Sequence, residues 1–369
     1  MSPERLQQIE TLYNDALALQ SSERTAFLDG TCGNDSDLRR EIESLLTYEQ
    51  QAETYMDRSA IQLVAESLAE HEAGVLVDRM LGRYQLLSLA GRGGMAEVYC
   101  AVDSRLNRLV AVKVLSKHMA EDRERSQRFE EEARAIAALN HPHICTLHDV
   151  GSDGGMHYLV FEYLVGELLS DRLSRGALPL PEAIDYATQI ADALAHAHEH
   201  GIIHLDLKPR NIMLTRTGVK LLDFGIAELH YPDTPKSSGV SLKRNAIDSN
   251  SATPGTRGYM APEQIEGRET DARTDIFGFG VVMYEMLTGR FLFPSRSPTA
   301  TASSVLSDNP PPASQLQPAV PPALDFLIAR CLARHPSERW QFISEMLSKL
   351  REIRSAFLEK SRKNLEGRD

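Results

Sequence analysis

The chain has 369 residues and a net charge of −12, from 40 basic and 52 acidic side chains. This length argues for two or three domains and a core large enough to fold without disulfide bonds. Residues 1–80 contain 6 basic and 16 acidic side chains, so −10 of the charge lies there and the remainder is nearly neutral. The acidic balance argues against nucleic acid or an anionic membrane as the main partner, because both attract basic surfaces.

The cysteines and the apolar runs favour a reducing compartment and a chain without a membrane segment. No CxxC spacing connects the four cysteines, which are Cys32, Cys100, Cys145 and Cys331. The N-terminal sequence MSPERLQQIE lacks the regions of a signal peptide, and no apolar run reaches the roughly 18 residues of a membrane helix. We therefore expect a cytoplasmic protein.

Residues 1–80 are predicted to form a separate helical region. Pro3 suits the first turn of a helix, and apolar residues recur at helical spacing from Leu6 to Ala16. Similar patterns follow up to about residue 70, without a repeat or a reactive cluster. We expect an acidic helical appendage that regulates the protein or recruits a partner and does not catalyse.

From Tyr84 the pattern changes to short runs typical of β-strands. YQLLSLA, EVYCAV, RLVAVKVL, CTLHDVG and HYLVFEYL are separated by Gly and Asn/Asp turns. One helical stretch, at about 121–139, lies between the third and fourth runs. The pattern predicts a five-stranded antiparallel sheet with one helix.

After Gly166 the helical period dominates. A helix is expected to begin at Pro181 and to end at Gly201. Two segments without periodicity, 231–256 and 308–322, are predicted to be loops. Only the first of these loops lies between motifs that carry chemistry.

The run GRGGMAEVY, from Gly91 to Tyr99, places glycines directly after a predicted strand. Glycines let a turn bring its backbone N–H groups against phosphate oxygens. Alone the run is weak evidence, because a flexible turn explains it equally well. A Rossmann nucleotide site is excluded by context, since EVYCAV continues as a strand and not as a helix.

Three further motifs, VAVK, HLDLKPRN and DFG, follow in the chain order of the protein kinase signature, and chance would rarely place all three in that order. Their polar residues are Lys113, Asp206, Lys208, Asn211 and Asp223. With APE at Ala261–Glu263, the chain resembles the eukaryotic-type (Hanks-type) protein kinase superfamily. The segments GRGGMAEVY, LNHPHICTLHDVG and GYMAPEQ most resemble those of the bacterial Ser/Thr protein kinases in this superfamily.

The resemblance covers about residues 81–352 and implies an α+β bilobal fold, with an antiparallel sheet and one helix in the N-lobe and a helical C-lobe. Residues 1–80 resemble the helical leader of some bacterial kinases, and residues 353–369 are predicted to be a charged C-terminal tail. The implied function is transfer of the γ-phosphoryl group of Mg-ATP to Ser or Thr hydroxyls of proteins, including autophosphorylation.

Catalytic roles are implied for Asp206, Lys208, Lys113 and Glu132. Lys113 would hold the α- and β-phosphates of ATP and pair with a helix carboxylate, at the position that Glu132 matches. Glu130 and Glu131 in the same run are the alternatives, and a solvated helix face would explain two of these three acidic residues. Asp206 would accept the proton of the substrate hydroxyl or orient that hydroxyl.

Lys208 would offset negative charge on the transferred phosphoryl group, and Asn211 with Asp223 would hold Mg²⁺, with Mn²⁺ as the alternative ion. The predicted nucleotide-binding residues come from the glycine-rich run, two strands, the hinge and one position below the adenine. They are Gly91, Arg92, Gly93, Gly94, Val98, Ala111, Lys113, Phe161, Glu162, Leu164 and Met213.

The motifs depart from the family pattern at two positions. Leu205 stands where most regulated kinases have an Arg that receives a phosphate on the activation segment, and Ala96 replaces the third glycine. Neither change removes a phosphate or metal ligand, so we expect activity that is largely independent of activation-segment phosphorylation. The LKPRN run, with Thr256 at the position that steadies Lys208, favours Ser/Thr over Tyr as acceptor.

The resemblance also implies contacts that need not touch substrate. These are a hydrophobic stack of Ile136, His204 and Phe224, a buried ion pair of Glu263 and Arg339, and a central buried helix with Asp275 and Gly280. His196 and His200 have the i, i+4 spacing of a metal pair, but no carboxylate or Cys spacing completes a site.

ATP and protein substrates with Ser or Thr are the implied partners, and the sequence leaves a homodimer open. Nucleic acid and a membrane segment are not expected. The alternative function is an ATP-binding pseudokinase that acts as a signalling scaffold through residues 1–80. It would require an inactive protein despite an intact set of motifs.

Overall fold

The computed structural model describes residues 31, 76–93, 96–115, 133–224, 257–294, 298–307 and 310–366. The chain divides into two compact units, Met1–Leu76 and Val77–Asp369. Almost all described residues belong to the second unit, and everything below concerns that unit. The predictions for the helical appendage and for the loop at 231–256 lie outside the described residues. Within the described part, no helix is both long and apolar enough to cross a membrane.

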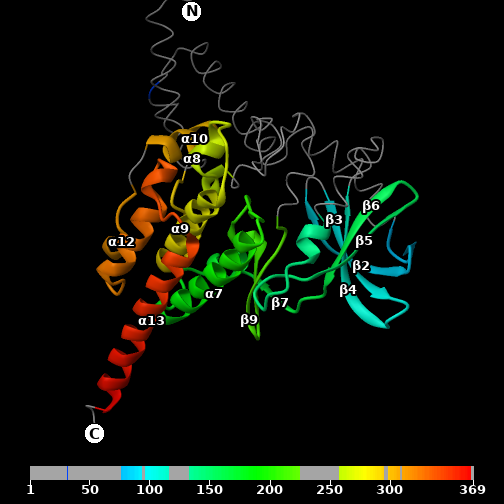
Figure 1. Ribbon diagram of the computed structural model, residues 1–369, viewed down its shortest axis with the longest axis horizontal. Coiled ribbons are helices and arrows are strands. Elements are labelled where there is room, and N and C mark those ends of the chain that lie inside the picture. Colours follow the sequence, from blue (N-terminus) through cyan, green and yellow to red (C-terminus); the bar gives the residue numbers. More distant parts are fainter. Residues whose placement is uncertain are drawn as a thin grey trace, which may run out of the picture. The chain divides into compact units, whose positions relative to one another are not determined.

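The N-lobe contains an antiparallel sheet (Figure 1), and its strands are hydrogen-bonded in the order β1-β2-β3-β4-β6-β5. Its strands are β1 (Met80–Leu81), β2 (Tyr84–Gly93), β3 (Ala96–Asp103), β4 (Arg108–Leu115), β5 (Leu147–Asp153) and β6 (Met156–Glu162). The five predicted strands are confirmed. The additional β1 pairs with β2 through a tight turn in which Gly82 has φ of +58°, and two residues are too short to give a periodic signal.

The register between β3 and β4 places three predicted site residues on one face. Val98 is opposite Lys113, and Ala111 lies two residues before Lys113 on the same strand. All three are half-buried, whereas their neighbours Tyr99 and Val112 are fully buried in the other face. The sheet therefore has one packed face and one face that remains accessible to a ligand.

Residues 133–137 are helical and form the described part of the helix predicted at about 121–139. Ala133 and Ile136 are buried and belong to the same hydrophobic core as Leu115 and Phe161 of the sheet. The rest of that helix, including Glu132 and its alternatives Glu130 and Glu131, lies outside the described residues.

The C-lobe begins with a small antiparallel sheet that the sequence did not predict. Its strands are β7 (Gly166–Leu168), β8 (Ile212–Thr215) and β9 (Gly218–Leu221), in the order β7-β8-β9. The segment before β5 reaches this sheet, because Leu221 N–H donates to His143 O and Cys145 N–H donates to Leu221 O, each at 2.8 Å. Strands as short as these are set by such contacts and give little local signal.

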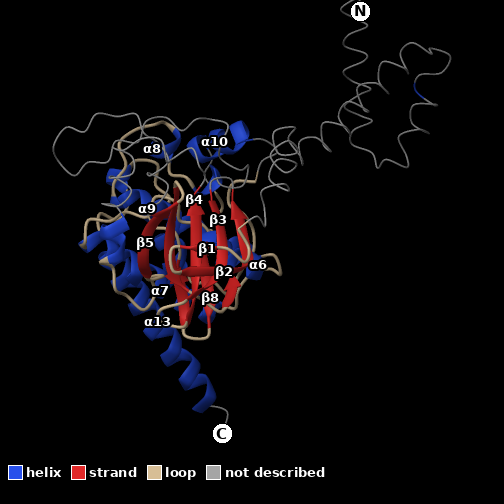
Figure 2. Ribbon diagram, turned by 90° about the vertical axis from the view of Figure 1, so that its right-hand side faces the viewer, coloured by secondary structure: helices blue, strands red, loops and turns tan. Residues whose placement is uncertain are grey.

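Helices make up the rest of the C-lobe (Figures 1 and 2). They are α6 (Leu169–Leu173), α7 (Leu180–Glu199), α8 (Pro262–Ile265), α9 (Ala272–Thr288), α10 (Pro298–Ser307), α11 (Ala313–Leu316), α12 (Pro322–Cys331) and α13 (Ile343–Glu366), with 3₁₀ turns η2 (Pro209–Asn211), η4 (Arg257–Tyr259) and η5 (Pro336–Glu338). Ion pairs from Arg351 to Asp192 (2.8 Å) and from Arg354 to Asp185 (2.5 Å) tie α13 to α7. Residues 353–366, part of the segment predicted as a charged tail, continue α13.

The central helix α9 is buried along most of its length, as expected for a helix that is apolar on all sides. Asp271 caps its start by accepting a hydrogen bond from Arg273 N–H, and Gly289, with φ of +65°, ends it. A Cβ on Gly280 would come within 2.7 Å of Cys331 Cβ. Glycine at this position therefore allows α12 to pack closely on α9, and α9 holds Asp275 rigidly beneath the site.

Candidate active site

The loop between α7 and β8 is held by the buried carboxylate of Asp275. Its two oxygens accept hydrogen bonds from the backbone N–H groups of His204 and Leu205, each at 2.8 Å. His198 Nε2 lies 2.8 Å from Asp275 Oδ2. Burial alone would raise the pKa of Asp275, but the His198 hydrogen bond and the nearby His204 outweigh it and lower that pKa. An ionised carboxylate on a rigid helix thus fixes the backbone just before Asp206.

Asp206, Lys208 and Asn211 form one polar cluster. Lys208 Nζ lies 2.8 Å from Asp206 Oδ2 and 3.0 Å from Oδ1. Asn211 Nδ2 donates to Asp206 Oδ2 at 3.0 Å and to the Asp206 backbone oxygen at 2.8 Å. The Asp206 side chain keeps 29% of its surface exposed. Its carboxylate is therefore oriented by two donors while it remains accessible to another molecule.

Lys113 and Asp223 meet across the two lobes. Lys113 Nζ lies 2.7 Å from Asp223 Oδ1. Burial would raise the pKa of Asp223, but the charge of Lys113, together with His204 and Lys208, outweighs it and lowers that pKa. Lys208 also bonds Asp206. These contacts therefore link Asp206, Lys208 and Lys113, the predicted catalytic residues that the structure describes, with the predicted metal ligand Asp223.

The predicted hydrophobic stack is confirmed in part. The rings of His204 and Phe224 are 4.6 Å apart, and His204 Nε2 lies 2.9 Å from Leu222 O. Asp223 sits between these anchored residues with φ of +58°, a conformation that non-glycine residues seldom adopt. Ile136 is buried in the same hydrophobic core as Phe224.

The glycine-rich run is only partly a turn. Gly91 and Gly93 are residues of β2 and pair with Val98 and Ala96 of β3. A Cβ on Gly91 would meet nothing within 4 Å, so its backbone is open. Arg92 bonds Glu97 of the neighbouring strand at 3.2 Å. Gly94 lies outside the described residues.

Phe161 and Glu162 end β6 beside the accessible face of the sheet. Phe161 pairs with Ala111 of β4 and is buried. The Glu162 carboxylate accepts hydrogen bonds from Lys220 Nζ at 2.6 Å and from Thr146 N–H at 2.8 Å. These bonds outweigh the effect of burial and lower the pKa of Glu162. Beyond its predicted backbone role, Glu162 therefore connects the two lobes through its side chain.

Sequence reasoning missed Lys220 as the partner of Glu162. It lies on β9, pairs with Met213 of β8, and also donates to Ile144 O at 3.1 Å. The one available signal was a lysine within the otherwise apolar strand VKLL. Met213 pairs with Leu168 on its other side and is half-buried.

The predicted ion pair of Glu263 and Arg339 is confirmed. Two N–H···O contacts of 2.7 and 2.8 Å join the side chains, both of which are almost fully buried. Thr274 Oγ1 donates to the same Glu263 carboxylate at 2.8 Å. Arg339 uses its other donors on the backbone oxygens of Ala333, Arg334 and Arg273. The pair has the full set of partners that offsets the cost of burying two charges.

The histidines near α7 form a ring stack. The ring centroids of His141 and His196 are 5.1 Å apart, and those of His196 and His200 are 4.4 Å apart. Across the described part of the chain, no group of three His, Cys, Asp or Glu residues is arranged to hold a metal ion. The i, i+4 pair of His196 and His200 therefore has no third ligand there.

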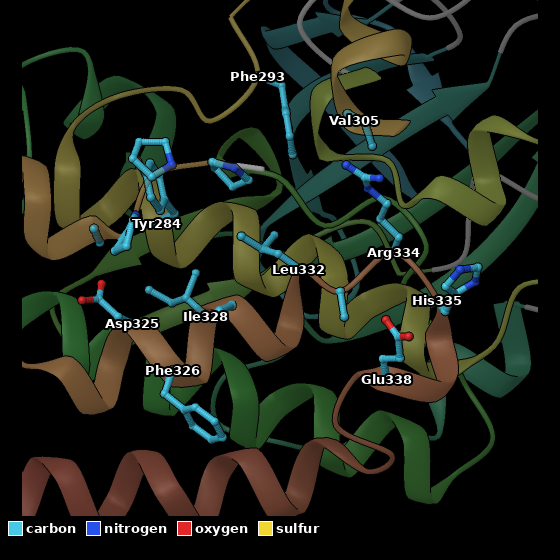
Figure 3. Close-up of a pocket in the computed structure, with 16 residues that line it drawn as sticks. Tyr284, Phe293, Val305, Asp325, Phe326, Ile328, Leu332, Arg334, His335 and Glu338 are labelled. Carbon is cyan, nitrogen blue, oxygen red and sulfur yellow. The ribbon is translucent and has the colours of Figure 1, made fainter. Parts of the chain in front are cut away.

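A separate cavity of about 710 Å³ lies in the C-lobe beside α10, α11 and α12 (Figure 3). Tyr284, Phe293, Ile328 and Leu332 are among the side chains that line it. Its lining includes none of the described residues predicted to bind ATP or to act in catalysis. The cavity thus belongs to a different part of the molecule from the polar cluster of Asp206.

Comparison with known proteins agrees with this geometry. The protein kinase domain model matches residues 84–350. Relatives include a probable serine/threonine-protein kinase of Clostridium acetobutylicum (39% identical over 278 residues, 75% of this chain and 40% of the relative), PknB of Mycolicibacterium smegmatis (40% over 274 residues, 73% and 42%) and PrkC of Bacillus subtilis (35% over 281 residues, 76% and 41%).

The crystal structure of the Mycobacterium tuberculosis PknI kinase domain matches with a TM-score of 0.57 and 26% identity, over 74% of this chain and 98% of that one. This chain spans about 40% of the length of the curated relatives that it matches. With a family model over most of its second unit and relatives of up to 40% identity, the chain belongs to the protein kinase family, among the bacterial serine/threonine kinases.

Proposed function

We propose that this chain is an ATP-dependent serine/threonine protein kinase. The observation that carries the proposal is the cluster of Asp206, Lys208 and Asn211 within reach of the Lys113–Asp223 pair. Phosphoryl transfer depends mainly on positioning and charge neutralisation, and this network offers one proton acceptor and two cations.

Asp206 is the proposed acceptor for the proton of the substrate hydroxyl. Lys208 and Asn211 each donate to its carboxylate, so one carboxylate geometry is favoured before the substrate arrives. Lys208 would also face the transferred phosphoryl group, where its positive charge offsets the charge that develops. A Ser or Thr hydroxyl, brought in by a protein substrate, is the group that Asp206 would activate.

The residues present fit a divalent cation. Asp223 offers a carboxylate and Asn211 an amide oxygen, the hard oxygen ligands that Mg²⁺ prefers, with Mn²⁺ as the alternative ion. Asn211 uses its Nδ2 group on Asp206, which leaves its oxygen for this purpose. When bound, Mg²⁺ would supply positive charge to the β- and γ-phosphate oxygens. Lys113 would contribute a second positive charge to the α- and β-phosphates.

The proposal extends to the organisation and location of the chain. Residues 81–352 would be the kinase domain, and residues 1–80 an acidic regulatory or recruiting region. The cysteines in the described ranges, Cys100, Cys145 and Cys331, are free thiols, which fits a reducing cytoplasm. A homodimer would bring two such acidic regions together.

Incubation of the purified chain with Mg²⁺ and γ-labelled ATP, followed by mapping of the label, tests the proposal. We expect label on Ser or Thr of an added protein substrate and of the chain itself. Label on tyrosine alone would contradict the acceptor class. A chain that binds ATP but transfers no label, beside an active relative as positive control, would instead be a scaffold of the pseudokinase type.

A further inference from the structure

The side chain of Gln264 connects the segment after the APE motif to the loop that carries Asp206. Gln264 lies on α8 and is 3% exposed. Its Oε1 accepts a hydrogen bond from Ala261 N–H at 2.9 Å, and its Nε2 donates to Leu205 O at 2.8 Å. The two ends of one buried amide are therefore bonded to backbone groups far apart in the sequence.

Leu205 needs such support because its backbone is unusual. Its φ is +62°, a value that non-glycine residues rarely adopt. Asp275 accepts from its N–H group, and Gln264 donates to its C=O group. The second bond holds the peptide unit between Leu205 and Asp206, and the orientation of that unit sets the direction in which the Asp206 side chain leaves the backbone.

The link carries no net charge. Leu205 is 5% exposed and apolar, at the position where an Arg would receive a phosphate in most regulated kinases. We propose that Gln264 is a positioning residue for Asp206, which couples the 257–265 segment to the catalytic loop through neutral hydrogen bonds. The proposal rests on the proposed function, because it assigns Gln264 to the orientation of the proton acceptor.

A merely structural role for Gln264 would be the capping of α8, and the two roles use different atoms. Capping needs only the Oε1 acceptor, whereas positioning also needs the Nε2 donor. Gln264→Glu separates them. A protonated carboxyl can still donate to Leu205 O, but an ionised carboxylate keeps the cap and loses the donor. Burial should raise the pKa of the introduced carboxyl toward neutrality.

The experiment compares kcat and KM of wild type, Gln264→Glu and Gln264→Met with an added peptide between about pH 6 and about pH 9. For Gln264→Glu, we expect the kcat ratio to wild type to fall as pH rises, by about tenfold, the equivalent of one neutral hydrogen bond. Gln264→Met should show a similar loss at every pH, with KM for ATP little changed. Asp275, His204 and Asp206 face the same peptide unit, so Gln264→Met, which adds no ionisable group, is the reference for the pH profile of Gln264→Glu.

Gln189→Met is the matched control, because Gln189 Oε1 accepts from Val219 N–H at 2.7 Å away from the catalytic loop. It should lower the melting temperature without the pH-dependent loss of kcat. A kcat ratio for Gln264→Glu that is flat and close to one, or full kcat in folded Gln264→Met, would overturn the role of Gln264. If Gln264→Met does not fold, the pH profile of Gln264→Glu decides alone. A wild type that transfers no phosphoryl group would contradict the proposed function itself.

Discussion

At the scale of single residues, Lys113 and Asp223 form a direct bond between the lobes. Lys113 is a predicted ATP ligand of the N-lobe, and Asp223 is a predicted metal ligand of the C-lobe. A cation bound between phosphate and Asp223 would compete for the same carboxylate. Lys113 would then be released toward the phosphates of ATP. The 2.7 Å contact thus pairs the positive charge of Lys113 with the negative charge of Asp223 before either group binds ATP or a cation.

Replacement of Asp206 by Asn, or of Lys113 by Met, should abolish most phosphoryl transfer and leave a folded protein. Loss of a proton acceptor typically costs about 10²- to 10⁴-fold in rate, and both side chains are partly exposed, so little packing is lost. Transfer rates and melting temperatures check this expectation. Lys349→Met, at an exposed ion pair on α13, is the control. Wild-type rates in either site variant would show that the roles are misassigned.

The buried carboxylates predict how stability depends on pH. The pKa values of the buried Glu263 and Asp275 are lowered in the folded protein. Their stabilisation is fully present above the ordinary carboxyl range near pH 4 and is lost as pH falls through the folded pKa values. Denaturant unfolding at neutral and acidic pH should show the free energy of unfolding falling across this window.

Glu263→Gln should remove part of that pH dependence and also destabilise the protein, by about 3 kcal/mol or more, because Arg339 would remain buried without its counter-ion. Asp185→Asn, at an exposed pair with Arg354, should change neither quantity appreciably. If the free energy of unfolding fell equally steeply at acidic pH in Glu263→Gln and in wild type, Glu263 would not contribute to this pH dependence.

At the scale of elements, the packing of α9 on α12 depends on one glycine. Gly280→Ala should destabilise by roughly 1–3 kcal/mol, the usual cost of overpacking, because its Cβ would lie 2.7 Å from Cys331 Cβ and 3.1 Å from a Leu332 methyl group. Gly278→Ala, on the same helix, meets Leu207 at an ordinary 3.4 Å. It should be neutral or stabilising through helix propensity. Equal melting temperatures for the two variants would contradict this packing.

The sequence predicts those elements whose signal is local. The five predicted strands of the first sheet are short apolar runs bounded by turn residues, and α7 has clear start and stop signals. The motifs identify Lys113, Asp206, Asn211 and Asp223 directly. The bonds from Lys220 to Glu162 and from Gln264 to Leu205 join residues 58 and 59 positions apart. Nothing near either end of such a bond marks its partner, so only the folded chain reveals it.

At the scale of the whole molecule, Leu205 bears on regulation. The segment between DFG and APE contains Ser237, Ser238, Ser241, Ser249, Ser251 and Thr253, all outside the described residues. A phosphate there would find no cation at Leu205, which is buried and apolar. A charge-assisted hydrogen bond is worth roughly 1.5–3 kcal/mol, and we expect that coupling to be missing.

Changing all six residues to Ala should therefore leave the initial rate on an added peptide within a few fold of wild type. Treatment of the wild-type chain with a phosphatase is the control, and it should have an equally small effect. A fall of about a hundredfold or more, with folding intact, would mean that another basic group receives the phosphate. The exposed Arg210, in the same HLDLKPRN run, would then be the first candidate to replace.

The Glu162 carboxylate has one more consequence for the molecule. It ends β6 of the N-lobe and is bonded to Lys220 of β9 and to Thr146 before β5, so the chain crosses between lobes at a point that is fastened on both sides. Opening and closing of the two lobes should then be a rotation about the Glu162 side chain and its two bonds, with little sliding of one lobe past the other. Because Asp223 follows Lys220 by three residues, it lies close in sequence to this fastened point, and we expect lobe rotation to move Lys113 relative to Asp223 more than it moves Asp223 relative to Lys220.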